Sequence, residues 1–531
     1  MISLSENHKL ARGVLLLTVS NLVVKACGLL FKIPLTALIG EEGMGYFNSA
    51  YTLFTYFYML STAGLPVVMS MSISRAAASN KGAAVKKIFR VGLSIFLVLG
   101  LVGSAGMILG AGFFASLMKV EKSRLAIIAI APTLFFICQS AALRGCFQGF
   151  GDMRPHAISQ LAEAVGKVAL GVALAYRAVQ MGESAEVAAA HAAFGLTVGI
   201  AAGMLVLYIA KLCVKPALPT DDIPEPTSVI AKSLVKTAVP ITLASSVMSL
   251  ANLLDTLIMT RRLHDIGLSQ AETVAIYGNY SSLAVPMFNL PPVLVYPIAY
   301  ALVPMLSALL EKRDIDGARK LCRAAVRVTS LIAMPCAAGM SVLSKPILSL
   351  FFADDVAERG AMMLSVLAPS SYLICILAIT NTVLQTCGRE RLPLWAMLAG
   401  GGVKLATSWL LIPMLGKYGT PVSTFLCYLV ILVISAWGIA AKTELGDIFA
   451  CGGLLLPLTA SLLSATAAAL IYGFTSMTIP AIVGAVLVYG LLMLIGYRPG
   501  EEEVGLIPGG QRLMLILRKK CKYEQTESRK S

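Results

Sequence analysis

Residues 148–167 read QGFGDMRPHAISQLAEAVGK, and residues 385–404 read QTCGRERLPLWAMLAGGGVK. Both stretches follow the pattern Q-x2-G-x2-R-x12-K without a gap, and they lie 237 positions apart. Each stretch follows one apolar run and opens another, so the same local arrangement recurs in the two halves of the chain. Such an internal repeat is typical of transporters that are built from two related bundles of membrane helices.

The composition indicates a polytopic membrane protein. Of the 531 residues, 57% are hydrophobic and 13% are charged, and the mean hydropathy is +0.80. Soluble domains have about 45–50% apolar and about 25% charged residues. The apolar runs predict about 14 transmembrane helices, since each is long enough to cross a bilayer. The first run, at about 11–39, is too long for the apolar part of a signal peptide, so we expect it to remain in the mature protein.

The basic residues predict the orientation of the chain. Of the 43 lysines and arginines, 30 fall in one alternate set of loops together with the two tails. The positive-inside rule then predicts a multi-pass protein of the cytoplasmic membrane with both termini in the cytoplasm. We assign the net charge of +15 to loops beside anionic membrane lipid rather than to nucleic acid.

The repeat also predicts the domain organisation. We expect an all-α polytopic membrane protein with two parallel-repeat six-helix bundles, at 1–228 and 229–445. Two extra transmembrane helices follow at 446–497, and a basic cytoplasmic tail follows at 498–531. The segment KPALPTDDIPEPTS at 215–228 is rich in proline and acidic residues, so we interpret it as the cytoplasmic connection between the bundles.

The first predicted span carries polar residues on one helical face. Asn21, Lys25, Gly28 and Lys32 follow the spacing of successive helical turns. A charge at the bilayer centre costs about 2.5–3.5 kcal/mol on insertion scales, so such residues usually face a cavity or a partner. We expect Lys25, near mid-span, to face a cavity. Lys32 either lines the same cavity or extends to the outer interface.

Charged residues also occur in later spans. Glu163 and Lys167 are four residues apart and predict either a structural ion pair or part of a substrate site. Lys404 is the repeat mate of Lys167, but Gly400 stands where Glu163 would. Lys404 therefore lacks a partner within its own helix and is a candidate anion ligand. Asp255 lies beside a polar face of the span at 231–260, where it either couples transport to an ion or a proton, or forms a static salt bridge.

Other chemistry is not indicated. The eleven cysteines and four histidines are scattered, so we expect neither a metal site nor a disulfide framework. The sequence contains no P-loop, GxSxG or HExxH motif, so we expect no enzyme and no cofactor. The span at 275–306 carries five prolines, which predict either bending points or static kinks.

Several segments together resemble a known family. They are KACGLLFKIPLTALIGEEGMGYFNSAYTLFTYFYMLSTAGLPVVMS (25–70), QGFGDMRP (148–155) and LANLLDTLIMTRRL (250–263). In this order they resemble polysaccharide transporters of the stage V sporulation protein B type. Those transporters belong to the multidrug/oligosaccharidyl-lipid/polysaccharide exporter superfamily. The resemblance covers nearly the whole chain and implies two six-helix bundles arranged as a V, with two additional helices as in the lipid II flippases.

The resemblance also implies a site. In lipid II flippases a basic residue, a glycine three positions later and a second basic residue line the cavity. Lys25 and Gly28 match that pattern, whereas Lys32 falls one position late. A cavity arginine of those flippases has no counterpart in AVPMFNLPP at 284–292. The candidate substrate-binding residues are therefore Lys25, Lys32, Asn21 and Lys404, and the candidates for ion coupling or charge pairing are Asp255, Glu163 and Lys167.

The function that the resemblance implies is a flippase or exporter. It would move an undecaprenyl-pyrophosphate-linked oligosaccharide, similar to the lipid II precursor of cell-wall or spore-cortex peptidoglycan, across the cytoplasmic membrane by alternating access. The implied partners are that substrate, anionic membrane lipid and cell-wall synthesis proteins, with no nucleic acid.

Three alternatives remain open. A cation-coupled multidrug exporter of the same superfamily would favour acidic and aromatic cavity residues. A membrane polysaccharide polymerase needs catalytic loops, which the sequence does not show. A non-transporting sporulation scaffold predicts that substitutions in the cavity are silent.

Overall fold

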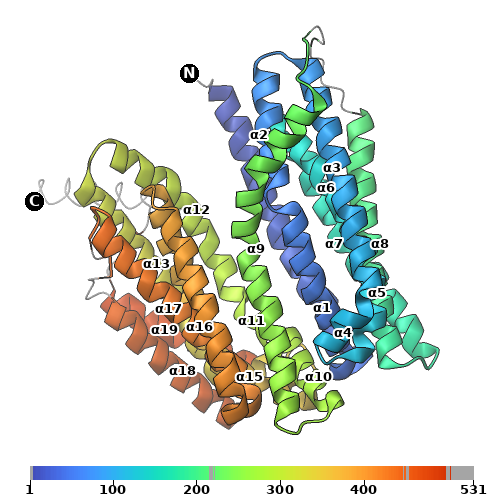
Figure 1. Ribbon diagram of the computed structural model, residues 1–531. Helices are drawn as coiled ribbons and strands as arrows, with labels where there is room; N and C mark the ends of the chain where they lie inside the picture. The colour runs from blue at the N-terminus through green and yellow to red at the C-terminus, as the bar shows by residue number, and fades with distance from the viewer. Residues whose placement is uncertain are drawn as a thin grey trace, which may run out of the picture. The chain divides into compact units, whose positions relative to one another are not determined.

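The computed structural model describes residues 4–213, 219, 222–446, 448–449, 454–497 and 503. Within this part of the chain the regular elements are helices (Figure 1). Two compact units are present, Met1–Ser282 and Leu283–Ser531. The first unit contains α1 (Leu4–Thr62), α2 (Leu65–Ala78), α3 (Gly82–Leu109), α4 (Ala111–Leu117), η1 (Glu121–Ser123), α5 (Arg124–Ile130), α6 (Pro132–Gly149), α7 (Arg154–Gln180), α8 (Ala185–Cys213), α9 (Thr227–Asp265) and α10 (Gln270–Asn279). The second unit contains α11 (Val285–Phe288), α12 (Leu290–Glu311), α13 (Ile315–Val342), α14 (Ser344–Ser349), α15 (Asp354–Thr386), α16 (Arg391–Leu415), η3 (Gly416–Tyr418), α17 (Gly419–Lys442), α18 (Leu455–Thr475) and α19 (Thr478–Gly496). The π-helix η2 (Tyr280–Ala284) contains the division between the units.

The all-helical membrane fold is confirmed. Eleven helical segments among the described residues are long and apolar enough to cross a membrane. The predicted number of fourteen is not confirmed, because some of these segments join neighbouring helices, as 391–442 joins α16 to α17.

The repeated motif forms the same turn twice. Gly151 after α6 has φ of 76°, and Gly388 after α15 has φ of 71°. In both places the residue after the glycine donates its N–H to a carbonyl five positions earlier, from Asp152 to Phe147 at 3.1 Å and from Arg389 to Leu384 at 2.8 Å. This arrangement ends a helix with a left-handed residue, where glycine is favoured because it has no Cβ. The glycine of the pattern is thus explained by backbone geometry.

α1 is broken by a single glycine. Gly40 has φ of 68° and ψ of −176°, so two helices meet there in one long element. The break falls where the sequence predicts the end of the first span. α1 then ends at Thr62, and α2 begins at Leu65 with a proline in its first turn. At this second bend a Cβ on Gly64 would collide with the carbonyl of Ala238 in α9, so the bend lies directly against α9.

The proline-rich span at 275–306 is interrupted. It consists of α10, the π-turn η2, the short α11 and then α12. Prolines remove backbone donors, and π-turns occur mostly as local irregularities within helices. The division between the compact units falls inside this interrupted stretch. The sequence repeat predicts a boundary between the two bundles near residue 228. That boundary is defined by the repeat and not by the compactness of the units, so it stays a prediction.

Each unit has its own hydrophobic core. In the first unit it includes Phe31, Phe47 and Phe96, and in the second unit it includes Leu302 and Ile376. Small residues let α7 and α8 approach closely, as glycines do in many membrane helix pairs. The contact glycines are Gly166 and Gly171 in α7 and Gly195, Gly199 and Gly203 in α8.

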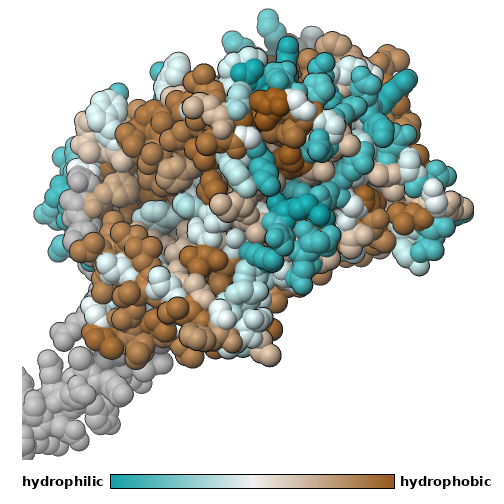
Figure 2. Space-filling view, turned by 90° about the horizontal axis from the view of Figure 1, so that it is seen from below, coloured by the Kyte–Doolittle hydropathy of each residue, from teal (hydrophilic) through white to brown (hydrophobic). Residues whose placement is uncertain are grey.

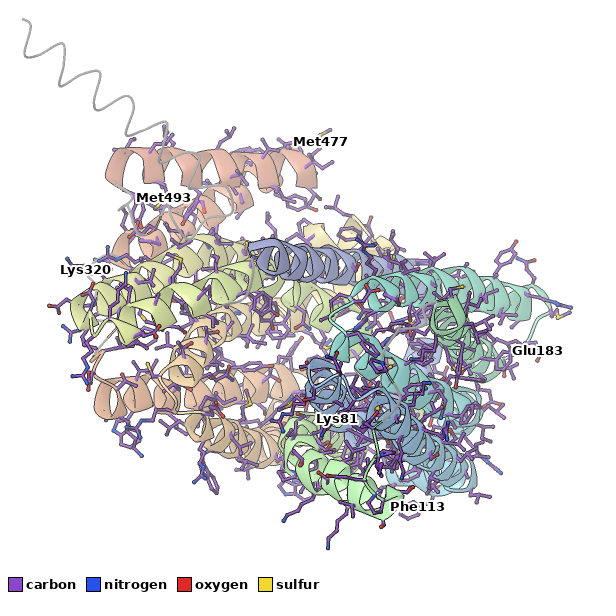
Figure 3. All side chains as sticks on the ribbon, turned by 90° about the horizontal axis from the view of Figure 1, so that it is seen from above. Lys81, Phe113, Glu183, Lys320, Met477 and Met493 are labelled. Atoms are coloured by element: carbon purple, nitrogen blue, oxygen red, sulfur yellow. The ribbon has the colours of Figure 1, made fainter. Side chains whose placement is uncertain are left out.

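The surface carries extended hydrophobic areas. Figure 2 shows broad brown areas beside a hydrophilic cluster on the face that it presents. α19 is the clearest single case: Met477 precedes its first residue, Met493 lies near its end (Figure 3), and Ala481 is its buried residue. Such an apolar helix with exposed side chains is typical of contact with lipid.

Candidate functional site

Lys32 connects two elements of the first unit. Its Nζ donates a hydrogen bond to the carbonyl oxygen of Ser281 at 2.8 Å. Ser281 lies in η2, where the π-helical partner of its carbonyl would be the nitrogen of residue 286. That residue is Pro286, which has no N–H. Lys32 therefore supplies a donor to a carbonyl in the interrupted helix.

Lys167 lies close to Lys32. Its Nζ is 4.8 Å from the ring centroid of Phe31 and 5.5 Å from that of Tyr51, so two aromatic faces stabilise the ammonium group. Lys32 and Lys167 are near enough for their charges to repel each other. Across the described ranges, no carboxylate forms an ion pair with either lysine. We call Lys32, Lys167, Phe31 and Tyr51 the cation cluster.

Glu163 pairs with a residue other than Lys167. It forms a salt bridge with Arg144 in α6, and the two side chains are only 15% and 12% exposed. Arg144 also donates a hydrogen bond to Ser159 at 3.0 Å. Gly203 makes room for this pair, because a Cβ there would overlap the Glu163 side chain. Lys167 is therefore not paired with Glu163, although the two residues are four positions apart in the same helix.

Sequence reasoning missed Arg144. It lies inside α6, which continues to Gly149. The available signal was its position among apolar and small residues in QSAALRGCFQG. The pairing between α6 and α7 could not be read from spacing along one helix.

The other predicted site residues lie in several places. Asn21 and Lys25 belong to α1, but their side chains lie outside the described residues. Lys404 is in α16 of the second unit and takes part in an interaction. A Cβ at Gly400 would overlap Ile431 of α17, so close helix packing explains why this half has no acidic residue there.

Asp255 belongs to a buried polar group in α9. Its own exposed fraction is 5%, and its charge acts on Tyr277 of α10. The Tyr277 hydroxyl lies 3.0 Å from the Thr52 hydroxyl and 3.4 Å from that of Thr256. Asn48 continues this layer with a 2.6 Å hydrogen bond to Ser282. The layer joins α1, α9, α10 and η2 within the first unit.

The segment GEEGMGYF (40–47) explains how α1 meets α10. A Cβ on Gly45 would overlap the carbonyl of Val274, and a Cβ on Gly278 would overlap that of Glu41. Asn279 also donates a hydrogen bond to the Glu41 carboxylate at 2.9 Å. The two helices therefore touch along their backbones, which requires glycine on both sides.

The fold and the buried charges define a class of protein. Helices interrupted beside buried polar and charged residues are typical of secondary transporters. The solved structure "Lipid II flippase MurJ, inward closed conformation" matches with a TM-score of 0.70 at 13% identity, over 91% of this chain and 99% of that chain. An inward-facing multidrug resistance MATE family transporter of the MOP superfamily matches with a TM-score of 0.63 at 15% identity, over 79% and 96%. The fold is therefore that of the MOP-superfamily transporters.

The family follows from the sequence. The model of the polysaccharide biosynthesis protein family matches residues 10–310, so the chain belongs to that family. The MatE model matches residues 240–410. The chain is thus a multi-pass transporter or flippase of the MOP superfamily, and the resemblance expected from the sequence is confirmed.

Three relatives from Bacillus subtilis (strain 168) are similar along most of the chain. The uncharacterized membrane protein YabM is 25% identical over 97% of this chain and 98% of its own length. Stage V sporulation protein B is 26% identical over 77% and 79%. Lipid II flippase MurJ is 22% identical over 80% and 82%. These names describe the relatives, one of which is named as a flippase.

Proposed function

We propose that this protein is a flippase for a lipid-linked oligosaccharide, moving an undecaprenyl-pyrophosphate-linked sugar across the cytoplasmic membrane. The similar lipid II flippase supports this class of substrate, and membership of the polysaccharide biosynthesis family agrees with it. In the proposed orientation both termini are cytoplasmic.

The cation cluster carries the proposal. Two lysines that repel each other are costly in a membrane interior, so a protein retains them where an anion is to be bound. Lysine binds phosphate groups as a point charge. The ring contacts and the Ser281 carbonyl hold both ammonium groups in place before the anion arrives. Pyrophosphate has the charge to neutralise both lysines, whereas a cationic drug would add to the repulsion.

Other predicted residues have supporting roles in this proposal. Lys25 and Asn21 would extend the anion site along α1, and Lys404 of the second unit stays a candidate anion ligand. Asp255 would couple transport to an ion or a proton, because it is buried beside hydroxyl groups. Glu163 is assigned to the structural pair with Arg144 instead.

The test compares lysine variants in a strain that depends on this protein. We expect Lys32→Ala and Lys167→Ala each to reduce the precursor exposed at the outer cell surface at least tenfold, with normal amounts of protein. Lys25→Ala tests a further candidate of α1 in the same way. Lys→Arg variants should retain part of the function, because the charge remains.

The matched control is Lys320→Ala, which removes an exposed lysine of α13 (Figure 3). It should leave precursor exposure unchanged. Normal exposure in both Lys32→Ala and Lys167→Ala would refute the assignment of the anion site to the cation cluster.

A multidrug exporter is the second candidate, and Asp255 is the observation that favours it. This buried acid lies within the segment that the MatE model matches. If the second candidate is right, Asp255→Asn should sensitise cells to cationic drugs while precursor exposure stays normal.

A further inference from the structure

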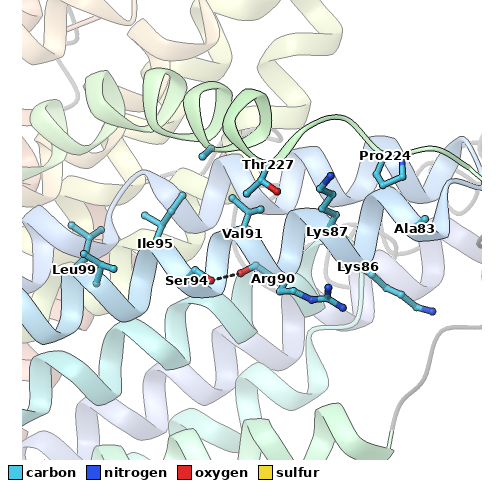
Figure 4. Close-up of a pocket in the computed structure, with 12 residues that line it drawn as sticks. Ala83, Lys86, Lys87, Arg90, Val91, Ser94, Ile95, Leu99, Pro224 and Thr227 are labelled. Carbon is cyan, nitrogen blue, oxygen red and sulfur yellow. Dashed lines mark hydrogen bonds between the residues drawn. The ribbon is translucent and has the colours of Figure 1, made fainter.

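A groove runs between α3 and α9 in the first unit (Figure 4). Its cavity volume is about 700 Å³. A second cavity of about 230 Å³ shares the lining residues Ile95 and Leu99 and continues along the same two helices. The groove has a basic end at the start of α3 and an apolar end toward its middle. None of these residues belongs to the cation cluster.

The basic end is formed by Lys86, Lys87 and Arg90. Lys86 and Arg90 are exposed, and Lys87 is half-buried. Within the described ranges, none of the three forms an ion pair with a carboxylate. One nearby acidic residue is already engaged, because Asp222 accepts hydrogen bonds from the N–H groups of Ala83 and Ala84 at 2.7 and 2.8 Å. The basic end therefore has positive charge available for an anion.

The apolar part has the length of one membrane leaflet. Leu99 lies nine positions after Arg90, which is about 13.5 Å along a helix. Half of the hydrocarbon core of a bilayer is about 15 Å. Val98 and Leu99 are 58% and 38% exposed, so this side of the groove is open to the surrounding lipid. An acyl chain can therefore enter sideways from the bilayer.

We propose that this groove binds an anionic glycerophospholipid of the leaflet that faces the basic end. The phosphate lies against Lys86, Lys87 and Arg90, and one acyl chain follows Val91 to Leu99. Free phosphate would use only the basic end and leave the apolar length empty. The groove is also lined by Pro224 and Thr227, so the bound lipid stabilises the packing of α9 and its preceding linker on α3. This inference rests on the groove alone and is independent of the proposed transport substrate.

The test uses the purified full-length protein and native mass spectrometry with added phosphatidylglycerol. The triple variant Lys86→Gln, Lys87→Gln, Arg90→Gln should bind phosphatidylglycerol at least about tenfold more weakly, because each basic residue near a membrane contributes to anionic lipid binding. The matched control replaces Lys232, Lys236 and Lys312 with glutamine. These three are exposed lysines outside the groove, and this variant should bind like the original protein.

A second variant tests the apolar part without changing charge. Ala231 lines the groove from α9, and Ala231→Phe should fill it and weaken phosphatidylglycerol binding by a similar factor. Gel filtration and thermal unfolding identify any variant that is not folded. In that case phosphatidylglycerol binding by the other variant tests the proposal.

Four results would overturn the proposal. They are unchanged phosphatidylglycerol binding in both folded variants, equal binding of phosphatidylcholine, displacement by millimolar inorganic phosphate, and displacement by an equimolar lipid-linked pyrophosphate. The last result would assign the groove to the transport substrate. Retention of phosphatidylglycerol against all three competitors, with loss in the variants, supports the proposal.

Discussion

The salt bridge between Arg144 and Glu163 should be the most sensitive charged contact of the first unit. Both side chains are largely buried, so Glu163→Gln removes the negative charge that pairs with the Arg144 guanidinium group and leaves that group with neutral partners such as Ser159. Breaking a buried pair by removing one partner costs about 3–5 kcal/mol. We expect this variant to lose stability in that range.

The reverse change should cost less. Arg144→Met leaves the Glu163 carboxyl group buried, and that group can take up a proton, whereas a guanidinium group cannot lose one at accessible pH. The remaining cost is that of a poorly satisfied neutral polar group, about 1–3 kcal/mol. In the double variant no uncompensated charge remains. Its loss of unfolding free energy should therefore be smaller than the sum of the losses in the two single variants by at least about 2 kcal/mol.

Equilibrium unfolding in mixed micelles measures these differences for the full-length protein. The control is the pair of Lys345 and Glu358, whose side chains are 47% and 70% exposed at 3.0 Å. Glu358→Gln should change stability by less than about 1 kcal/mol, as is usual for surface pairs. If the losses of Glu163→Gln and Arg144→Met are equal and add up in the double variant, the pair is not coupled and the reasoning is wrong.

Two further predictions concern backbone contacts. Gly278→Ala should weaken the contact between α1 and α10 by about 1–3 kcal/mol, because the new Cβ overlaps a backbone carbonyl. Cysteine labelling at this contact should therefore increase. The control is Gly106→Ala, whose Cβ meets nothing within 4 Å, and it should leave labelling unchanged. Equal labelling of both variants would contradict this. Desolvation raises the pKa of Asp222, but the N–H groups at the start of α3 lower it more, so the pKa lies below its usual range. Because the pKa is lowered, the ionised carboxylate stabilises the docked linker at pH values above the unfolded pKa of about 3.9. This contribution is lost as the pH falls through the folded pKa. Cleavage of the linker by pepsin, relative to cleavage of an unfolded reference peptide at each pH, should therefore increase at the acidic end of a pH series. Asp222→Asn should remove this increase, and an unchanged profile would contradict the assignment.

The fold could be predicted because its signals are local. Long apolar runs, the glycine at the repeated turn and the proline-rich span each act through the backbone of their own segment. Gly151 and Gly388 take left-handed conformations in both halves, so a sequence pattern corresponds directly to a structural one. The number of spans was less certain, because a kink such as that at Gly40 joins two helices into one element.

The contacts of the site could be predicted only in part. Helical spacing predicts that Glu163 pairs with Lys167. Because α6 contacts α7, Glu163 instead forms a salt bridge with Arg144. Such a choice depends on how helices pack. The same holds for the aromatic rings around Lys167, which come from α1. Sequence spacing thus identified the charged residues of α7, and tertiary packing determined their roles.

The hydrogen bond between Lys32 and Ser281 joins a lysine of α1 to the interrupted helix at η2. Within a membrane a backbone carbonyl needs a donor and a lysine needs an acceptor, because unsatisfied polar groups are costly there. Each group satisfies the other across 2.8 Å. In the proposed function, an incoming pyrophosphate competes with that carbonyl for the ammonium group. Binding of the anion then removes a donor from the interrupted helix at η2, so occupancy of the site and the geometry of this helix are energetically coupled.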